Sequence, residues 1–265
     1  MQTISERNFT SILEKNIFDN CMLLPSFDND VMAEEKTCYI CDNSINSFLC
    51  VIKYKEIYQI PPSIELFAET DEAADEIIEK ILMLESSGYD LVSYKNDKVI
   101  KNIALRKHIS SDIQYLKSYY APIEKDYSTA PSFNSVKIFI NDNVLEFDEH
   151  FLNQSGNHII ITIKAAERNP EDYKIIYLLK DDNIIGYIAL YKKYKNIWDT
   201  SFIFIDERER KRGYGQYLCG YAADYLKKQN RTLFYSYCAT PASEKTAVTS
   251  GLLPCAERYI TSIIL

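Results

Sequence analysis

The sequence predicts a mixed α/β fold, with strands and helices sharing a mixed sheet, built as two units. In the second half, a β-meander over residues 175–205 leads through a glycine turn into an amphipathic helix. The first half shows a similar succession of three strands, a helix and a strand between residues 38 and 94. A polar segment with Pro122 and Pro131 separates the halves. We therefore predict an N-terminal α/β domain at residues 1–134 and a second domain at residues 135–265.

The composition is that of an ordinary globular protein, with 46% hydrophobic and 26% charged residues among 265. Its apolar runs are too short to span a membrane, and residues 1–7 lack the pattern of a signal peptide, so we expect a cytoplasmic protein. The net charge is −9 over residues 1–134 and +1 over residues 135–265. This distribution argues against general nucleic-acid binding. The acidic half is either a solvated surface or a region that attracts a cationic substrate.

The cysteines do not form a recognisable framework. There are seven, an odd and scattered set that does not predict disulfides. The C-x-x-C at Cys38 and Cys41 has no second pair or histidine cluster near it in sequence. Small buried residues on a strand are therefore a better interpretation than a zinc site, and we predict no metal.

In the first half, a short helix is predicted at residues 3–16, and a second helix follows an N-cap at Thr70 with an acidic first turn. Gly88 is expected to end that helix. The remaining elements predicted from apolar and aromatic patterns are strands at Cys38–Ile40, Phe48–Tyr54, Ile64–Phe67 and Leu91–Tyr94, and a helix at Ile109–Tyr120.

In the second half, Ile175–Leu179 and Ile184–Leu190 flank Asp181 and Asp182 as a β-hairpin, and Ile197–Ile205 completes the meander. The helix from Gly213 to Lys228 carries its apolar residues on one face. The other predicted elements are strands at Val136–Ile140, Leu233–Tyr237 and Arg258–Ile264, and helices at Val144–Leu152 and Pro241–Ser250, with residues 159–172 ambiguous.

The glycine turn is the stretch that indicates chemistry. Three of the seven glycines, at 213, 215 and 220, lie within eight residues, directly after an apolar strand and a basic cluster. Such a strand–turn–helix layout points backbone N–H groups and the positive end of a helix at an anion. Pyrophosphate is the natural ligand, and a basic surface turn capped by glycines is the alternative.

At this point the sequence resembles the GNAT superfamily of N-acetyltransferases. Residues 210–215, Arg-Lys-Arg-Gly-Tyr-Gly, match the acyl-CoA signature R-x-x-G-x-G, and residues 238–252 resemble the following strand, short helix and terminal Gly-aromatic pair, here Gly-Leu. The resemblance covers about residues 136–265. It implies a GNAT acyl-CoA fold for this half and acetyl-CoA as co-substrate. The first half is then either a degenerate GNAT-like copy, without the glycine turn, or an unrelated α/β domain.

The resemblance also implies a set of cofactor-binding residues. In the family the pantetheine arm lies between two parted strands and pairs with the backbone of one of them, while the pyrophosphate sits on the amides of the turn. Carried onto this sequence, the residues are Ile203, Phe204, Ile205, Arg210, Lys211, Arg212, Gly213, Tyr214, Gly215, Gln216 and Thr240.

The catalytic residues are less well indicated. The family's frequent tyrosine acid corresponds to Ala247, and its frequent asparagine to Thr240. We therefore name Tyr237 as candidate acid, with a packing tyrosine as the alternative. Asp199 is the candidate base, expected to share a strand face with Ile203 by the two-residue period, with a solvent-facing aspartate as the alternative. Tyr235 and Glu167 are weaker candidates.

The leading hypothesis is an N-acetyltransferase that moves an acetyl group from acetyl-CoA to the amine of a small molecule by direct attack in a ternary complex. The N-terminal domain would cover the acceptor side and set specificity. A catalytically weak or inactive acyl-CoA-binding module is the alternative. A nucleic-acid or phosphopeptide binder is disfavoured, because Glu207 and Glu209 offset the basic cluster.

Overall fold

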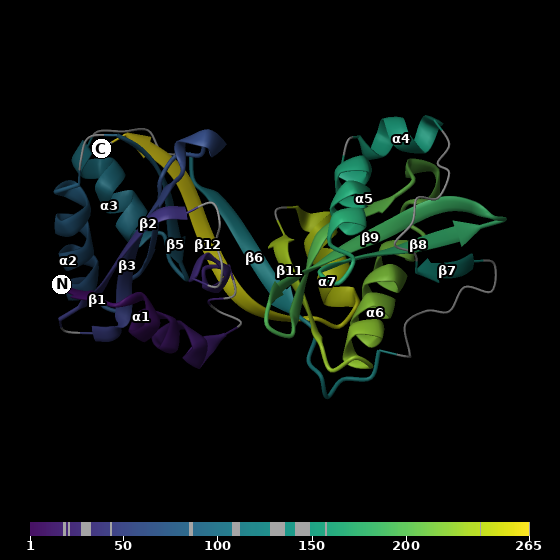
Figure 1. The fold of residues 1–265 in the computed structure, drawn as a ribbon, viewed down its shortest axis with the longest axis horizontal. Coiled ribbons are helices and arrows are strands. Elements are labelled where there is room, and N and C mark those ends of the chain that lie inside the picture. The colour runs from purple at the N-terminus through teal and green to yellow at the C-terminus, as the bar shows by residue number, and fades with distance from the viewer. Residues whose placement is uncertain are drawn as a thin grey trace. The chain divides into compact units, whose positions relative to one another are not determined.

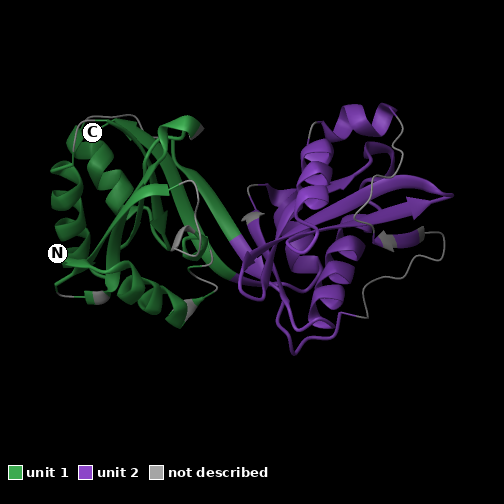
Figure 2. Ribbon diagram, in the orientation of Figure 1, with its two compact units in different colours: residues 1–117, 255–265 green, residues 118–254 purple. Residues whose placement is uncertain are grey.

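The chain divides into two compact units (Figure 2), Met1–Lys117 with Cys255–Leu265, and Ser118–Pro254. The computed structural model describes residues 1–17, 20, 22–27, 33–42, 44–84, 87–107, 112–127, 136–140, 149–156, 158–238 and 240–264. We refer to the two parts as unit 1 and unit 2.

Unit 1 is a sheet covered on one face by two helices (Figure 1). Its strands lie in the order β1-β2-β3-β4-β5-β12-β6. The elements are β1 Gln2–Ile4, α1 Glu6–Leu13, β2 Ala33–Cys41, β3 Ser44–Tyr54, β4 Ser63–Phe67, α2 Asp71–Leu82, β5 Gly88–Tyr94, α3 Lys98–Lys107, β6 Gln114–Tyr120 and β12 Leu253–Ile264, with 3-10 helices at Glu14–Asn16, Leu24–Phe27 and Glu56–Tyr58.

Unit 2 is a sheet with helices on both faces (Figure 1). Its strand order is β6-β11-β10-β9-β8-β7. The elements are β7 Val136–Ile140, α4 Glu149–Ser155, α5 His158–Arg168, β8 Tyr173–Lys180, β9 Asn183–Tyr194, β10 Ile197–Ile205, the 3-10 helix η4 Glu207–Glu209, α6 Tyr214–Lys227, β11 Thr232–Cys238 and α7 Pro241–Thr249.

The same topology occurs in both units. In unit 1, β2, β3 and β4 form an antiparallel meander, and α2 leads to β5, which is parallel to β4. In unit 2, β8, β9 and β10 form the meander, and α6 leads to β11, which is parallel to β10. The internal repeat that the sequence suggested is therefore present in the fold.

The division between the units differs from a single cut after residue 134. Strand β12, from the end of the sequence, pairs with β5 in unit 1. Conversely, residues that follow β6 belong to unit 2, where Ala121 N donates to Leu233 O at 2.8 Å. Tyr119, Ala121 and Tyr127 are buried in the core of unit 2. Each unit thus contains a segment from the other half of the sequence, which local composition does not reveal.

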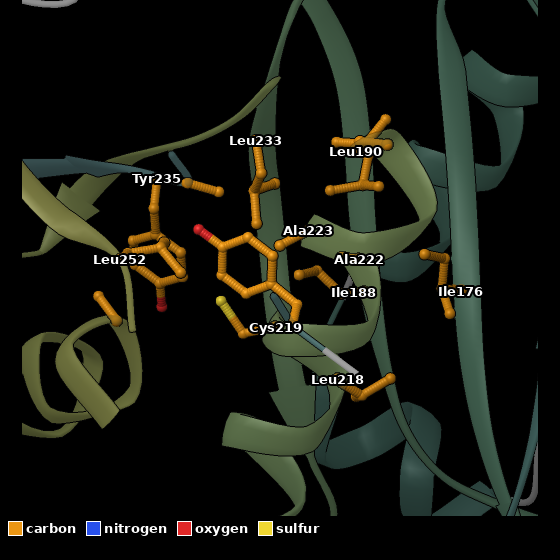
Figure 3. Packing of buried hydrophobic residues seen from close by; sticks show 14 of the residues in the cluster. Ile176, Ile188, Leu190, Leu218, Cys219, Ala222, Ala223, Leu233, Tyr235 and Leu252 are labelled. Carbon is orange, nitrogen blue, oxygen red and sulfur yellow. The ribbon is translucent and has the colours of Figure 1, made fainter. Parts of the chain in front are cut away.

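The core of unit 2 follows from the amphipathic pattern of α6. Leu218 and Ala222 are fully buried against strands β8, β9 and β11 (Figure 3). Leu226 is fully buried in the same cluster. Tyr225, predicted on the same stripe, is partly buried beside this cluster. On the opposite face, α4 and α5 cover a second cluster with Phe151, Ile159 and Ile163. The helix prediction for residues 213–228 is therefore confirmed.

Several other elements agree with the sequence predictions. Thr70 caps α2 by accepting from Ala73 N at 3.2 Å. Asp181 and Asp182 take φ values of 50° and 61°, as a tight hairpin turn with right-handed strand twist requires. Strand β7 matches its predicted bounds. The predicted helix at Val144–Leu152 falls partly outside the described residues, and α4 covers its last part.

Three element predictions were wrong in whole or in part. The helix predicted at residues 3–16 begins only at Glu6, because Gln2–Ile4 form strand β1, which pairs with β2. Residues 114–120 form strand β6 and not part of a helix: Leu116 and Ser118 are buried with the two-residue period of a strand. The aromatic residues of this stretch favour a strand, and the actual helix, α3, lies earlier. Gly88 does not end α2, which stops at Leu82 with Met83 as its C-cap; Gly88 instead begins β5. Among the described residues, no helix has the length and hydropathy needed to cross a membrane.

Gly186 of β9 offers a test of how closely β9 and β10 pack. A Cβ atom at this position would lie 2.8 Å from the carbonyl oxygen of Phe204, which belongs to the backbone and cannot rotate away. We expect Gly186→Ala to lower the free energy of unfolding by about 1–3 kcal/mol through overpacking. Urea denaturation measures it. At the control position, Gly88, an added Cβ meets nothing within 4 Å; equal losses in Gly186→Ala and Gly88→Ala would contradict the prediction.

Candidate functional site

Strands β10 and β11 separate partway along their length. They pair in parallel only from Ile197 with Thr232 to Asp199 with Phe234. Beyond these positions the rest of β10 pairs with β9 and not with β11, although the backbone of both strands is described. Parting two parallel strands in this way leaves backbone groups that a ligand lying between them can bind. This fork is the central geometric feature of unit 2.

A β-bulge at Ser201 changes which side chains share a face of β10. Thr200 is opposite Leu190 and Phe202 is opposite Ala189, so Ser201 is an extra residue. Phe202 and Phe204 lie on the α4–α5 side, whereas Ile203 and Ile205 pack on the α6 side. Asp199 bonds to Tyr191, whose ring stacks on Tyr173 of the α4–α5 side. Asp199 therefore does not share the face of Ile203, because the bulge breaks the two-residue period.

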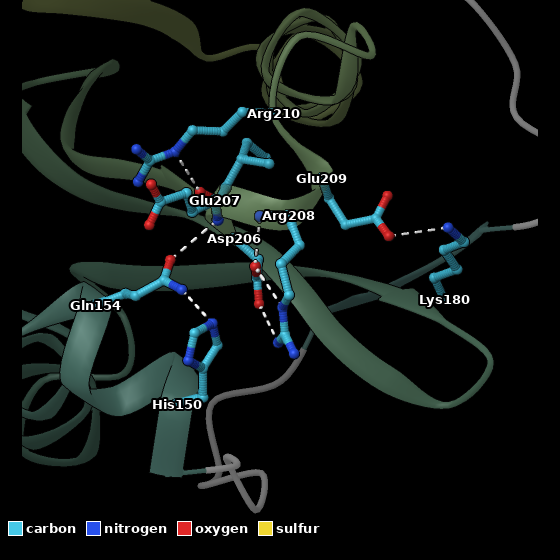
Figure 4. Close-up of polar contacts among 9 residues, drawn as sticks. His150, Gln154, Lys180, Asp206, Glu207, Arg208, Glu209 and Arg210 are labelled. Carbon is cyan, nitrogen blue, oxygen red and sulfur yellow. Dashed lines mark hydrogen bonds and ion pairs between the residues drawn. The ribbon is translucent and has the colours of Figure 1, made fainter.

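After β10 the chain makes a turn that is held by side chains (Figure 4). Asp206 is buried, caps η4 through Arg208 N at 2.9 Å, and pairs with the Arg208 guanidinium at 3.0 and 2.6 Å. The hydrogen bond from the Arg208 side chain lowers the pKa of Asp206. Gln154 of α4 accepts from Glu207 N at 3.0 Å, and Lys180 pairs with Glu209 at 2.9 Å. The turn is thus anchored to α4 and β8.

The predicted pyrophosphate loop continues from this turn into α6. Lys211 and Gly213 both have left-handed backbones, with φ of 64° and 86°. The first recorded bond from α6 back to the loop runs from Tyr217 N to Gly213 O. By helix geometry, the amides of the preceding turn point along the axis and out of the N-terminus. This is the arrangement that favours an anion.

The side chains around the loop take defined positions. Arg210 turns back, donating from Nε to Ile205 O at 3.0 Å, and its guanidinium lies over the Phe204 ring. Arg212 pairs with Glu209 at 3.1 Å. Gly215 faces Thr246 of α7, and a Cβ there would lie 3.6 Å from Thr246 Oγ1, an ordinary contact. Gln216 donates to Thr249 O at 2.8 Å.

The cofactor residues predicted from sequence therefore fall into two groups. The first group, residues 203–205 and 210–216, runs from the part of β10 that does not pair with β11, through the turn, into α6. Thr240 lies elsewhere, at the start of α7 after β11, and its side chain closes a capping box with Ser243. That hydroxyl accepts from Ser243 N at 3.2 Å, so it serves the helix start in this structure.

The catalytic candidates differ in their surroundings. Asp199 is fully buried; its Oδ1 accepts from Ser236 N at 3.1 Å and its Oδ2 from Tyr191 OH at 3.0 Å, with Lys193 Nζ at 3.5 Å. Burial raises the pKa of Asp199, and the Lys193 ammonium acts in the opposite direction. Tyr237 belongs to β11, but its side chain lies outside the described part of the structure. Asp199 was predicted to be either a base or a solvent-facing residue, and its complete burial was not expected.

The weaker candidates lie apart from the fork or inside the core. Tyr235 is buried in the α6-side cluster, and burial raises its pKa. Glu167 is exposed on α5, and Ala247 is fully buried in the α6-side cluster. Tyr191, Lys193 and Ser236 contact Asp199 but were not predicted from the sequence. The short turn that joins β9 to β10 could have indicated the first two, since a hairpin places them beside Asp199.

No metal site emerges in the part of the chain that the structure describes: no three His, Cys, Asp or Glu side chains gather there. The C-x-x-C cysteines lie on opposite faces of β2, as a spacing of three dictates in a strand. Cys38 Sγ is 3.2 Å from Cys50 Sγ, whereas Cys41 packs in the cluster beneath α2.

Comparisons with known proteins bear on both units. Residues 139–247 match the family model described as Acetyltransferase (GNAT) family. No curated protein matches the sequence. The X-ray structure of a Drosophila protein is similar, with a TM-score of 0.63 at 14% identity, over 99% of this chain and 98% of that chain.

Two further structures are similar over nearly the whole of this chain. A GCN5-related N-acetyltransferase from Sphaerobacter thermophilus has a TM-score of 0.57 at 8% identity, over 99% of this chain and 94% of that one. A tandem GNAT protein from the clavulanic acid biosynthesis pathway has a TM-score of 0.54 at 8% identity, over 99% and 97%. Residues 139–247 therefore match the GNAT acetyltransferase family model, and the chain as a whole shares its fold with solved structures that include a tandem GNAT protein.

Proposed function

We propose that the protein is an N-acetyltransferase that transfers the acetyl group of acetyl-CoA to the amine of a small molecule. The observation that carries the proposal is the fork between β10 and β11, which opens directly beside the glycine turn at the start of α6. A neutral amine attacks the thioester carbonyl in a ternary complex. The C–N bond forms, the C–S bond breaks, the thiolate leaves as CoA and takes up a proton, and the amine loses one.

The cofactor half of the site is supported by its backbone. The pantetheine arm would lie along residues 203–205, where β10 has no recorded partner in β11. The pyrophosphate would bind the amides of residues 211–215 at the N-terminus of α6, where the helix dipole and the N–H groups of the first turn favour anions. The preformed turn at Asp206 lowers the ordering cost of binding, because its side-chain contacts already hold the loop.

Two residues are candidates for the proton transfers of the reaction, Tyr237 and Asp199. Tyr237, on the part of β11 beyond the fork, is our candidate for the acid that protonates the thiolate. The sequence predicts Asp199 as the base, but a base must reach the proton that it removes. The Asp199 carboxylate is fully buried and both of its oxygens already accept hydrogen bonds. These contacts favour a different role for it.

An inactive acyl-CoA-binding module is the second candidate function. It is favoured by one observation, the fully buried Ala247 at the position where the family often has a tyrosine acid. A nucleic-acid binder has less support, because Arg208 and Arg212 are paired with Asp206 and Glu209. Phosphate tracking along a strand needs many unpaired cations.

For unit 1 we propose a part in selecting the acceptor. Its equivalent strands, β4 and β5, pair from Ser63 with Asp90 to Leu66 with Ser93, which leaves no comparable fork. Asp71 and Glu72 occupy the first turn of α2, where an anion would otherwise bind. Any contribution of unit 1 to the reaction would therefore not come through a second cofactor site of this kind.

Changing Gly215 tests the cofactor site. We expect Gly215→Glu to weaken acetyl-CoA binding at least 10-fold, about 1.4 kcal/mol, because a carboxylate would compete with the pyrophosphate for the helix terminus. Isothermal titration calorimetry measures it. Gly215→Ala is the control: its Cβ fits beside Thr246, so affinity should stay within about threefold. Binding that is indifferent to Gly215→Glu would reject the proposed pyrophosphate loop.

Turnover separates the enzyme from the inactive module. We expect free thiol to appear from acetyl-CoA when primary amines are supplied, at a rate well above the rate without amine, because direct attack needs the acceptor in place. A thiol-reactive dye follows the reaction across a panel of small amines. Saturable acetyl-CoA binding with no amine-dependent thiol release for any member of the panel would favour the inactive module.

The pair of Asp206 and Arg208 predicts a pH dependence. The pKa of Asp206 is lowered from 3.8, so the charged pair stabilises the fold above that pH and the contribution is lost as the pH falls through the lowered value. Asp206→Asn keeps an acceptor for Arg208 N but loses the charge, and should cost about 1 kcal/mol near neutral pH.

Urea denaturation of both proteins at several pH values is the measurement. The difference between them should shrink as the pH falls below 3.8, since the native Asp206 becomes neutral as well. A difference that stays constant down to the lowest pH at which both proteins remain folded would show that the charge on Asp206 is not responsible.

A further inference from the structure

The side chain of Asp199, the last β10 residue that pairs with β11, extends past the point where the two strands part. Asp199 is the final β10 residue in register with β11, opposite Phe234. Its Oδ1 accepts from the backbone N of Ser236, two residues further along β11, at 3.1 Å. In a continuing parallel ladder, a backbone carbonyl of the neighbouring strand would accept from such an N–H. Here a carboxylate on a longer side chain does so.

Two side chains from β9 hold the carboxylate in this orientation. Tyr191 OH donates to Oδ2 at 3.0 Å, and Lys193 Nζ lies 3.5 Å from the same oxygen. Lys193 also donates to the Tyr191 hydroxyl at 2.8 Å, and its side chain is 11% exposed. A fully buried carboxylate is costly unless it is paired and hydrogen-bonded, and these contacts meet that requirement. The Asp199 side chain thus links β9, β10 and β11.

Strand β11 is held from its other side at the same residue. Ser118 Oγ of β6 donates to Ser236 O at 2.9 Å, and Ala121 N donates to Leu233 O at 2.8 Å. Both backbone polar groups of Ser236 are therefore bound by side chains, one from each neighbouring strand. The distance between β11 and β10 just past the fork then depends on the reach of the Asp199 side chain.

We propose that Asp199 is a positioning residue, whose carboxylate fixes the separation of β10 and β11 and so holds open the slot for the pantetheine arm. The identification of the pantetheine arm as the ligand rests on the proposed function, whereas the effect of Asp199 on the strand separation does not. Asp199 then acts through Ser236 and touches neither substrate nor cofactor. Asparagine can keep the contact with Ser236, because an amide oxygen can still accept from Ser236 N while its NH₂ group donates to the Tyr191 hydroxyl. It also removes the charged partner of Lys193, so we expect Asp199→Asn to be less stable than the native protein.

Amide hydrogen exchange, followed by NMR without any CoA, tests the contact itself. The Ser236 amide should be protected in the native protein and in Asp199→Asn, and should exchange at least about 10-fold faster in Asp199→Ala, which lacks the acceptor. The rate is compared with that of Ile188 in β9, so that global unfolding is separated from a local change. Tyr191→Phe is the control and should leave Ser236 protected, since it removes only a partner of Oδ2.

Binding and turnover of acetyl-CoA then test the role. Asp199→Asn should keep both the dissociation constant and kcat within about threefold, whereas Asp199→Ala should bind at least 10-fold more weakly. A general base would behave differently: Asp199→Asn would lose roughly 10²–10⁴-fold in kcat with unchanged binding. That result would overturn the proposal, as would a Ser236 amide that exchanges equally fast in native protein and Asp199→Ala.

The experiments distinguish failure of the proposed function from failure of the positioning role of Asp199. If the native protein does not bind acetyl-CoA, the proposed function fails, and the exchange of Ser236 still decides whether Asp199 holds the strands. If Asp199→Ala does not fold, Asp199→Asn decides alone. Protection of Ser236 with kept turnover supports the proposal, and loss of either one in a folded Asp199→Asn contradicts it.

Discussion

Beyond Asp199 and Phe234 the backbones of β10 and β11 stop pairing, and the rest of the candidate site in unit 2 depends on that separation. It leaves the end of β10 without a second partner strand, directly before the turn that starts α6. Several contacts maintain it without a ligand. The bulge at Ser201 redirects β10, the Asp199 carboxylate spans to Ser236, and Asp206 fixes the turn that follows.

Unit 1 shows what the same topology does without that separation. Its β4 and β5 stay paired over most of β4, and α2 begins with a threonine cap and two acidic residues in place of a glycine turn. Negative side chains at a helix N-terminus occupy the position where an external anion would bind. Glu65, a half-buried acid on β4, accepts from Tyr94 and Ser63 within the unit. The two halves therefore share a topology and differ in whether it leaves an opening.

Much of this fold could be predicted from the sequence, and the exceptions have physical causes. The hairpin at Asp181 and Asp182, the cap at Thr70 and the stripe of α6 are local signals that burial reinforces. Residues 114–120 were predicted as part of a helix but form a strand. A short aromatic segment can adopt either structure, and here pairing with neighbouring strands determines which one forms. The exchange of β6 and β12 segments between units is a non-local pairing that no local pattern encodes.

The candidate site divides in the same way. Gly213 and Gly215 stand out by their spacing after a strand, so the proposed loop could be located from the sequence alone. The surroundings of Asp199 could not be found in this way, because a bulge at Ser201 shifted its face, and its partners lie on two other strands. We therefore propose that unit 2, and not unit 1, holds an acyl-CoA site.

The most direct test follows backbone amide NMR signals while CoA is added. The account predicts shifts concentrated at residues 203–205 and 211–216, and none at residues 71–74 at the start of α2. Equal shifts at both helix starts, or unchanged signals at residues 211–216 under saturating CoA, would contradict it.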